Sequence, residues 1–263
     1  MSTASGGPDW AIVTGASAGI GRELARGLAA EGHALVLVAR RAEALAALAE
    51  ELRQAHGIQA LPLAIDLAGV DGADRLTGEL TARGIVPRVL VNNAGIGVYG
   101  MHAGNPVEEV QALLDLNIIA LTRLTRKLLP AMLAAGRGHI LNMASTAAFM
   151  PGPRMAVYFA SKAYVLSYSE ALAEELAGSG ISVTALCPGP TRSGFFRRAR
   201  MRDDTLSNDL ADAAAVARFG LQAMRRGQRV GIHRVRNKLL VLAARVAPRR
   251  MLAAIVERVT RPP

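Results

Sequence analysis

The sequence predicts a single α/β domain, spanning residues 1–263, that is built on a doubly wound parallel sheet. Six short apolar segments typical of buried strands alternate with longer segments typical of helices. A cluster of glycines directly follows the first of these strands. With 263 residues, 51% of them hydrophobic, the chain is long enough to bury a substantial core without disulfides.

The first strand and helix enclose the glycine cluster. Trp10–Thr14 is predicted as a buried strand and Gly15–Gly21 as a turn, and an Ala- and Leu-rich helix then runs to Gly32. Glycines here let backbone N–H groups approach a pyrophosphate, which then lies at the positive end of the helix dipole. The spacing is Gly-x-x-x-Gly-x-Gly, and its position between a strand and a helix indicates a dinucleotide site.

The second strand, Ala34–Ala39, ends in Arg40 and Arg41. In a dinucleotide-binding fold an acidic residue at this point binds the ribose 2′-hydroxyl, whereas an arginine accepts a 2′-phosphate. The absence of an acid therefore predicts NADP(H), with NAD(H) as the less favoured cofactor. The simpler alternative is two solvated arginines that open a surface helix.

Polar residues follow the later strands of the predicted sheet. The strand over 59–65 ends at Asp66 and Leu67, which we expect beside an adenine, and the strand over 88–92 ends at two amides. The remaining predicted elements are helices over 42–56, 71–84, 106–135 and 158–176, and strands over 139–145 and 181–187. Asn117 lies inside the third of these helices, where by itself it could simply satisfy a buried carbonyl.

Tyr158 and Lys162 have the i, i+4 spacing that stacks two side chains on one helix face. The pair would place a proton donor beside a fixed positive charge. Such pairs also arise by chance in ordinary half-buried helices, so their meaning depends on the residues around them.

Six motifs have the order and spacing of one known family: Thr14–Gly21, Asn92–Gly95, Asn117, Ser145, Tyr158-x-x-x-Lys162 and Pro188–Gly189. Together they resemble the short-chain dehydrogenase/reductase family over about residues 10–192, and the ketoreductase-like branch with 3-oxoacyl reductases and hydroxysteroid dehydrogenases in particular. The resemblance implies a Rossmann fold with about seven strands, for which Gln228–Ile232 is the expected last strand.

The resemblance also implies a mechanism of carbonyl reduction, or of alcohol oxidation in reverse. Tyr158 would exchange a proton with the substrate oxygen as hydride moves to or from the nicotinamide. Lys162 would lower the pKa of Tyr158 and bind the nicotinamide ribose. Ser145 would stabilise the developing oxyanion, and Asn117 would hold a water that links Lys162 to solvent.

The family's cofactor contacts carry over by motif. We expect Arg40 at the 2′-phosphate, and Ala18 departs from the Lys or Arg of many NADP-preferring relatives, so that specificity would rest on Arg40, Arg41 and Ser17. The other predicted cofactor-binding residues, besides Tyr158 and Lys162, are Gly15, Gly19, Ile20, Gly21, Asp66, Leu67, Asn93, Ala94, Gly95, Pro188, Gly189 and Thr191.

The last part of the chain is strongly basic. Residues 192–263 hold 17 Lys and Arg against 5 Asp and Glu, about +12, whereas residues 1–191 hold 14 against 16, about −2. Residues 193–225 are predicted as a substrate lid and a helix, in which Phe195, Phe196 and Met201 either line an apolar pocket or anchor the lid. Residues 236–260 are predicted as a basic helical extension that meets its own core, a second subunit or a membrane surface.

Composition also restricts the partners. The basic tail lacks an aromatic stacking platform, which argues against nucleic acid, and the five histidines have no metal-ligand spacing. We expect a cytoplasmic homo-oligomer, a dimer or tetramer, that acts on a small carbonyl or alcohol, apolar or an acyl thioester. The single cysteine, Cys187, is predicted to be a buried strand thiol. The alternative function is a non-catalytic NADP(H)-binding sensor or scaffold.

Overall fold

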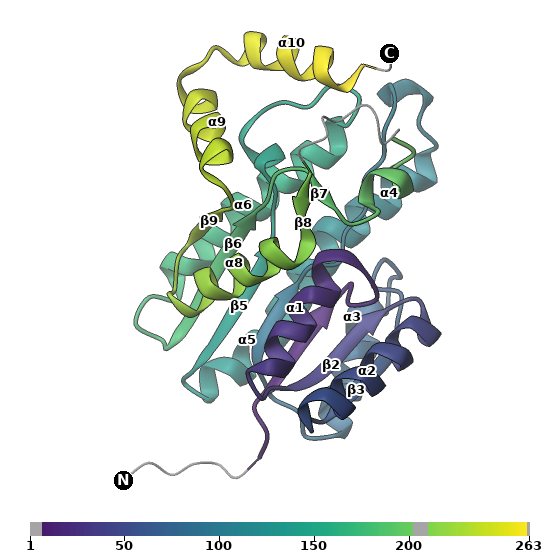
Figure 1. The fold of residues 1–263 in the computed structure, drawn as a ribbon, viewed down its shortest axis with the longest axis vertical. Coiled ribbons are helices and arrows are strands. Elements are labelled where there is room, and N and C mark those ends of the chain that lie inside the picture. Colours follow the sequence, from purple (N-terminus) through teal and green to yellow (C-terminus); the bar gives the residue numbers. More distant parts are fainter. Residues whose placement is uncertain (1–6, 202–209, 262–263) are drawn as a thin grey trace.

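The computed structural model describes residues 7–201 and 210–261, and part of the predicted lid, residues 202–209, lies outside them. A parallel sheet of seven strands forms the centre (Figure 1). Its order is β3-β2-β1-β4-β5-β6-β9, which confirms the predicted doubly wound sheet. The strands are β1 (Trp10–Thr14), β2 (Ala34–Ala39), β3 (Ala60–Ala64), β4 (Pro87–Asn92), β5 (Gly138–Met143), β6 (Ile181–Cys187) and β9 (Val230–Ile232).

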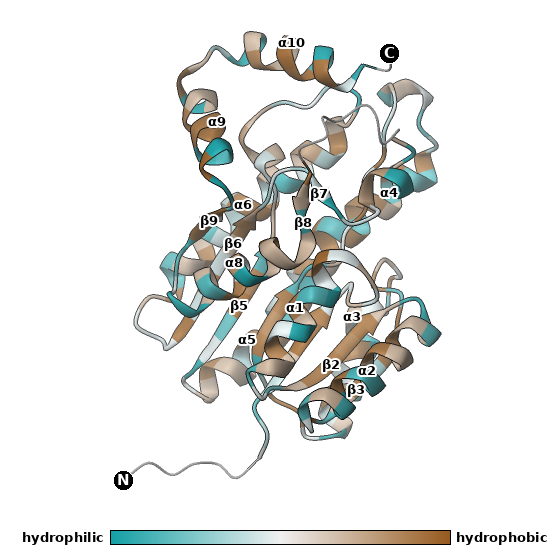
Figure 2. Ribbon diagram, viewed as in Figure 1, coloured by the Kyte–Doolittle hydropathy of each residue, from teal (hydrophilic) through white to brown (hydrophobic). Residues whose placement is uncertain are grey.

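Helices cover both faces of this sheet because alternate strand residues point to opposite sides. Ala11 and Val13 pack toward one face, whereas Ile12 between them packs toward the other. The first face is covered by α1 (Gly19–Ala30), α2 (Ala42–His56) and α8 (Ala213–Arg225), and the second by α3 (Gly72–Ala82), α5 (Leu121–Ala134) and α6 (Ala156–Glu175). Brown strands lie between the mixed-colour helices in Figure 2.

The strand order reverses between β1 and β4, since one half of the sheet grows outward from β1 and the other from β4. The carboxyl ends of the strands at such a switch point form the crevice in which open α/β sheets bind ligands. The predicted polar residues therefore meet at this edge.

Three elements differ from the prediction. The long helix over 106–135 is divided into α4 (Val107–Leu114), a π-helical turn (Asp115–Ala120) and α5. The strand predicted to end at Ser145 ends at Met143, because the Ser145 hydroxyl accepts a hydrogen bond from Ala147 N and starts a 3₁₀ helix, Thr146–Phe149. A small parallel pair, β7 (Thr191–Arg192) with β8 (Ala211–Asp212), was not predicted.

The C-terminal extension forms two helices, α9 (Val235–Val246) and α10 (Arg249–Thr260), at one end of the molecule (Figure 1). Pro248 separates them and precedes the first residue of α10. Among the described residues, none of the helices combines the length and apolarity needed to cross a membrane. Cys187 is a buried free thiol, which confirms its prediction.

Candidate active site

The glycine turn is closely packed against its own backbone. Gly15 and Gly19 have positive φ values of 68° and 56°, which an L side chain rarely adopts. A Cβ on Gly21 would lie 2.3 Å from Gly15 O and 2.4 Å from Asn93 Nδ2. The first turn of α1 has no side-chain cap at Ala18. Its N–H groups and the bare glycine backbone therefore suit a phosphate at the helix N-terminus.

Thr14 ties the glycine turn to the end of β4. Its hydroxyl donates to Val91 O at 3.1 Å and accepts from the backbone N–H groups of Asn93 and Ala94 at 2.9 and 3.0 Å. The Asn93 amide in turn donates to Thr14 O at 2.9 Å. Asn93 and Ala94 thus hold the two loops of the switch point together.

Cationic side chains converge beside Ser17. Arg41 donates to Ser17 O and Ser17 Oγ at 3.0 and 3.1 Å, and Arg22 donates to the same carbonyl at 2.9 Å. The Nε of Arg22 is buried and has no hydrogen-bond partner among the described residues. Two guanidinium groups that share one carbonyl repel each other unless an anion lies nearby. The pair of Arg22 and Arg41 therefore fits the 2′-phosphate of NADP(H).

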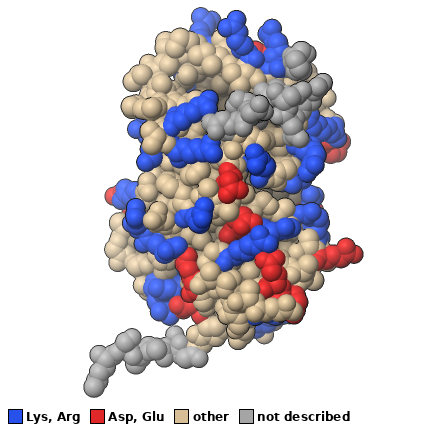
Figure 3. Space-filling view, viewed as in Figure 1, with Lys and Arg blue, Asp and Glu red and all other residues tan. Residues whose placement is uncertain are grey.

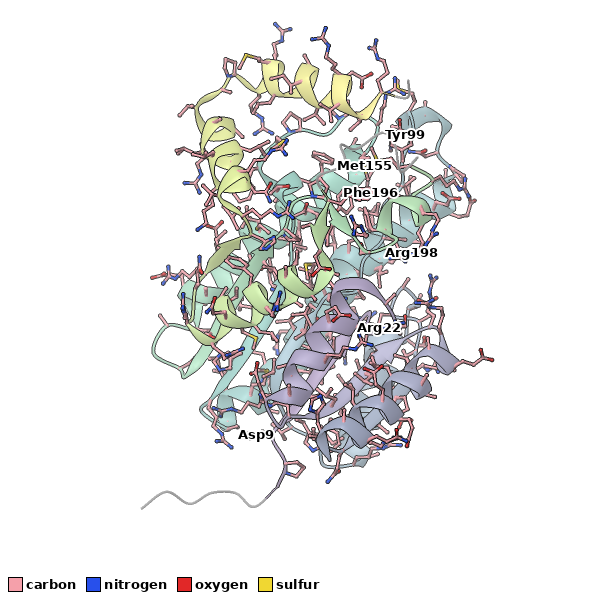
Figure 4. All side chains as sticks on the ribbon, viewed as in Figure 1. Asp9, Arg22, Tyr99, Met155, Phe196 and Arg198 are labelled. Carbon is pink, nitrogen blue, oxygen red and sulfur yellow. The ribbon has the colours of Figure 1, made fainter. Side chains whose placement is uncertain are left out.

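Arg198 joins this cluster from α7 (Phe195–Arg198), the short helix of the lid. Burial lowers the pKa of Arg198, and the charges of Arg41, Arg197 and Arg40 lower it further. Figure 4 shows Arg198 above Arg22. Neither Arg22 nor Arg198 was predicted from the sequence. Arg22 could have been, because it directly follows the glycine motif. Arg198 could not, because no sequence pattern relates it to Arg40.

Ser145 and Tyr158 meet at the carboxyl edge of the sheet. The Ser145 hydroxyl donates to Pro188 O at 3.5 Å and accepts from Ala147 N at 3.1 Å. Burial raises the pKa of Tyr158 to about 12, and the nearby Ser145 hydroxyl opposes this shift. The family resemblance implies that Lys162 lowers this pKa; the pKa of Tyr158 is instead raised, because desolvation of the phenolate dominates.

Lys162 lies one helical turn beyond Tyr158. Its Nζ donates to Met143 O at 2.7 Å and is 5.7 Å from the centroid of the Tyr158 ring. Burial lowers the pKa of Lys162 to about 8. The ammonium therefore stays charged at neutral pH but close to its titration point.

Asn117 occupies the π-helical turn and is 2% exposed. Its Oδ1 accepts from Ile96 N, and its Nδ2 donates to Ile96 O, both at 3.0 Å, and to Ser161 Oγ at 3.1 Å. A Cβ on Gly95 would lie 3.2 Å from Asn117 Oδ1 and 3.6 Å from Lys162 Nζ. Asn117 thus fixes the loop after β4 beside Lys162, and the sequence offered no signal for Ser161.

The other predicted cofactor residues are dispersed. Asp66 is exposed and its Oδ1 accepts from Ala68 N, whereas Leu67 and Ile20 pack against the two faces of the core. A Cβ on Gly189 would lie 2.7 Å from Asn237 Nδ2, so Gly189 permits the approach of α9. The carbonyls of Pro188 and Gly189 accept from Thr146 N and the Thr191 hydroxyl.

In the predicted lid, Phe195 packs against the ring of Tyr158. The rings of Phe195 and Tyr158 have centroids 5.1 Å apart, and a Cβ on Gly97 would lie 2.6 Å from the tip of Phe195. Met201 is buried and so anchors the predicted lid, and Phe195 contacts both Tyr158 and Gly97. Next to these residues lies a cavity of about 250 Å³ lined by Gly97, Tyr99, Gly100, Met101, Gly104, Asn105, Pro106, Glu109 and Arg198–Arg200.

The sheet order, the glycine turn and the residues around Tyr158 define the class of dinucleotide-binding α/β proteins of the Rossmann type. The family model described as short chain dehydrogenase matches residues 9–204. The chain belongs to the short-chain dehydrogenase family of oxidoreductases, which confirms the family and the fold predicted from the sequence.

Individual relatives agree with this membership. A very-long-chain 3-oxoacyl-CoA reductase of Aspergillus clavatus is 37% identical over 176 residues, which cover 66% of this chain and 51% of that protein. The chain thus spans about half the length of this fungal relative. A very-long-chain 3-oxoacyl-CoA reductase of Rattus norvegicus is 30% identical over 229 residues, 83% of this chain and 71% of that protein.

A solved structure has the same architecture. The short-chain dehydrogenase from Sphingobium yanoikuyae in complex with NADPH superposes with a TM-score of 0.81 and 33% identity, and the match covers 90% of this chain and 93% of that one.

Proposed function

We propose that this protein is an NADP(H)-dependent oxidoreductase that interconverts a ketone or aldehyde with an alcohol. The observation that carries the proposal is the placement of Tyr158 between Ser145, which acts on the pKa of its phenol, and Lys162, whose Nζ is 5.7 Å from the Tyr158 ring. The convergence of Arg22 and Arg41 on Ser17 supports NADP(H), and so does the NADPH in the Sphingobium structure.

The side chains divide the proton chemistry among them. When bound, NADPH supplies the hydride. Tyr158 donates its phenolic proton to the substrate oxygen, and Ser145 donates a hydrogen bond to the same oxygen. A phenol with a pKa of about 12 is neutral at pH 7, so Tyr158 carries the proton that reduction requires. Lys162 stabilises the tyrosinate that remains, and Asn117 holds the adjoining loop in place.

We further propose a 3-oxoacyl thioester with an apolar chain as the substrate. The names of the fungal and rat relatives support this class. The cavity of about 250 Å³ beside Phe195 offers Gly97 and Met101 to a hydrocarbon chain, and Arg198 and Arg200 lie at the same cavity, where they suit an anionic carrier.

The decisive experiment compares Tyr158→Phe with Tyr164→Phe. Both variants lose one phenolic hydroxyl from α6, but Tyr164 is 38% exposed and its hydroxyl pairs with Thr122. NADPH oxidation is followed with a panel of ketones, aldehydes and 3-oxoacyl thioesters. We expect Tyr158→Phe to lower kcat/KM by roughly 10²–10⁴-fold and Tyr164→Phe to leave it unchanged.

Full activity in Tyr158→Phe contradicts the assigned proton donor. Tight NADPH binding by a protein that reduces no member of the panel favours the sensor or scaffold instead.

Three properties are proposed from the sequence and the fold together: a homo-oligomer, a cytoplasmic location and contact of the C-terminal extension with a membrane surface. Light scattering after gel filtration measures the first, and cell fractionation with and without salt washing measures the other two.

A further inference from the structure

The helix α9 exposes a stripe of apolar side chains. Val235, Leu239, Leu242 and Val246 recur at i, i+4, i+7 and i+11, which places them on one face of the helix. They are 70%, 62%, 61% and 82% exposed. The opposite face carries the buried Val241 and Ala244, which α9 uses to pack against the domain. The stripe therefore serves no contact within the described part of the chain.

The helix α10 repeats this arrangement. Met251, Ile255 and Val259 recur at i, i+4 and i+8 and are 49%, 51% and 53% exposed. Thr260, the last residue of α10, lies on the opposite face and is buried. Such a concentration of exposed apolar side chains on two neighbouring helices usually marks a site of interaction with another molecule or a lipid surface.

Basic residues surround both stripes. Residues 234–261 contain eight Lys and Arg and one acid, Glu257, for a net charge of +7. Glu257 is already paired with Arg154. Figure 3 shows Lys and Arg spread over the end of the molecule formed by α10, with little acid among them. Two short helices with an apolar face and a basic border have the composition of helices that lie in a lipid interface.

The net positive charge of residues 234–261 indicates which kind of molecule binds this face. A two-fold contact through this face would oppose a +7 patch to an identical one. An anionic bilayer instead attracts each basic side chain and accepts the apolar stripes at the boundary between headgroups and acyl chains. We propose that α9 and α10 form a docking surface for membranes that contain anionic lipids.

This surface is connected to the cavity beside the proposed active site. The Tyr99 hydroxyl donates to Thr260 O at 2.5 Å, and the Thr260 hydroxyl lies 3.3 Å from Pro153 O. Arg154 donates to Glu257 at 3.1 and 3.2 Å. Because Tyr99 lines the cavity, docking of α10 places the cavity next to the membrane surface (Figure 4). The docking proposal itself does not depend on the reaction proposed above.

The test is sedimentation of the full chain with vesicles of phosphatidylcholine alone or with added phosphatidylserine. One variant combines Leu239→Ser, Leu242→Ser and Val246→Ser, and its control combines Val70→Ser and Val107→Ser, which are 88% and 76% exposed elsewhere. A second variant combines Lys238→Gln, Arg245→Gln and Arg250→Gln, with Arg75→Gln as its control. NADPH binding and circular dichroism confirm that each variant is folded.

We expect the wild type and both controls to bind the anionic vesicles far better than the neutral ones, and less well at high salt. The charge variant should bind about 100-fold more weakly, since each basic side chain contributes about fivefold. The stripe variant should lose binding to a similar extent.

Equal binding to neutral and anionic vesicles overturns the lipid assignment, as does undiminished binding by the folded stripe variant. The wild type could also fail to bind vesicles and instead form a dimer that the stripe variant converts to a monomer. In that case a second copy of the chain binds this face, and the proposal is wrong.

Discussion

The pH dependence of carbonyl reduction tests the assigned roles of Lys162 and Tyr158. Reduction requires a charged Lys162 and a protonated Tyr158, whose pKa values are about 8 and about 12. As the pH rises from 7 to 9, the charged fraction of a group with a pKa of 8 falls from about 90% to about 10%. The kcat/KM for reduction should therefore fall about tenfold over this interval, because kcat/KM reports groups of the free enzyme.

The measurement is the initial rate of NADPH oxidation at subsaturating ketone between pH 6 and about 10. Cys187→Ala is the control: burial raises the pKa of this neighbouring thiol to about 12, so it should leave the decline in place. Lys162→Met should remove the decline and lower the rate at neutral pH by about 10²-fold or more. A flat profile in the wild type, or a decline that disappears with Cys187→Ala, refutes the assignment to Lys162.

Three substitutions test other parts of the molecule. Gly21→Ala places a Cβ 2.3 Å from Gly15 O and should weaken NADPH binding at least tenfold by calorimetry; unchanged affinity would contradict the phosphate site. Arg41→Ala should raise the KM for NADPH about 10–100-fold and leave that for NADH unchanged, whereas equal effects on both cofactors would argue against 2′-phosphate recognition. Asn92→Ala deprives Asn142 Oδ1 of its donor and should reduce the free energy of unfolding in urea by about 2–3 kcal/mol; a loss below 0.5 kcal/mol, roughly, would show that the pair contributes little.

The sheet and its edge were predictable because they follow from local rules. Buried parallel strands are short apolar runs, and the residues after them must gather at one edge. This reasoning predicts that residues after β1 and β4 meet, and Thr14 and Asn93 are hydrogen-bonded to each other. It did not separate Asn92 from Asn93: the Asn92 amide turned inward, where it donates to Thr125 Oγ1 and Asn142 Oδ1 at 3.0 and 2.9 Å.

The errors come from long-range effects. The pKa of Tyr158 depends on how much of the fold covers the phenol, which neighbouring sequence cannot give. The π-helical turn at Asn117 depends on Ile96, a residue 21 positions away whose backbone N–H and C=O both bond the Asn117 amide. A buried amide that satisfies two backbone groups outweighs the regular hydrogen bonding of one helical turn.

The lid shows why the substrate could not be predicted. From the sequence, Phe195 was either a pocket residue or an anchor, and the structure makes it both: its ring lies 5.1 Å from that of Tyr158, and its tip fills the space that only a glycine at position 97 leaves free. In the proposed reaction the substrate oxygen approaches the Tyr158 hydroxyl beside this ring. We therefore expect the contact between Phe195 and Gly97 to restrict which ketone binds, and these two residues are almost 100 positions apart in the sequence.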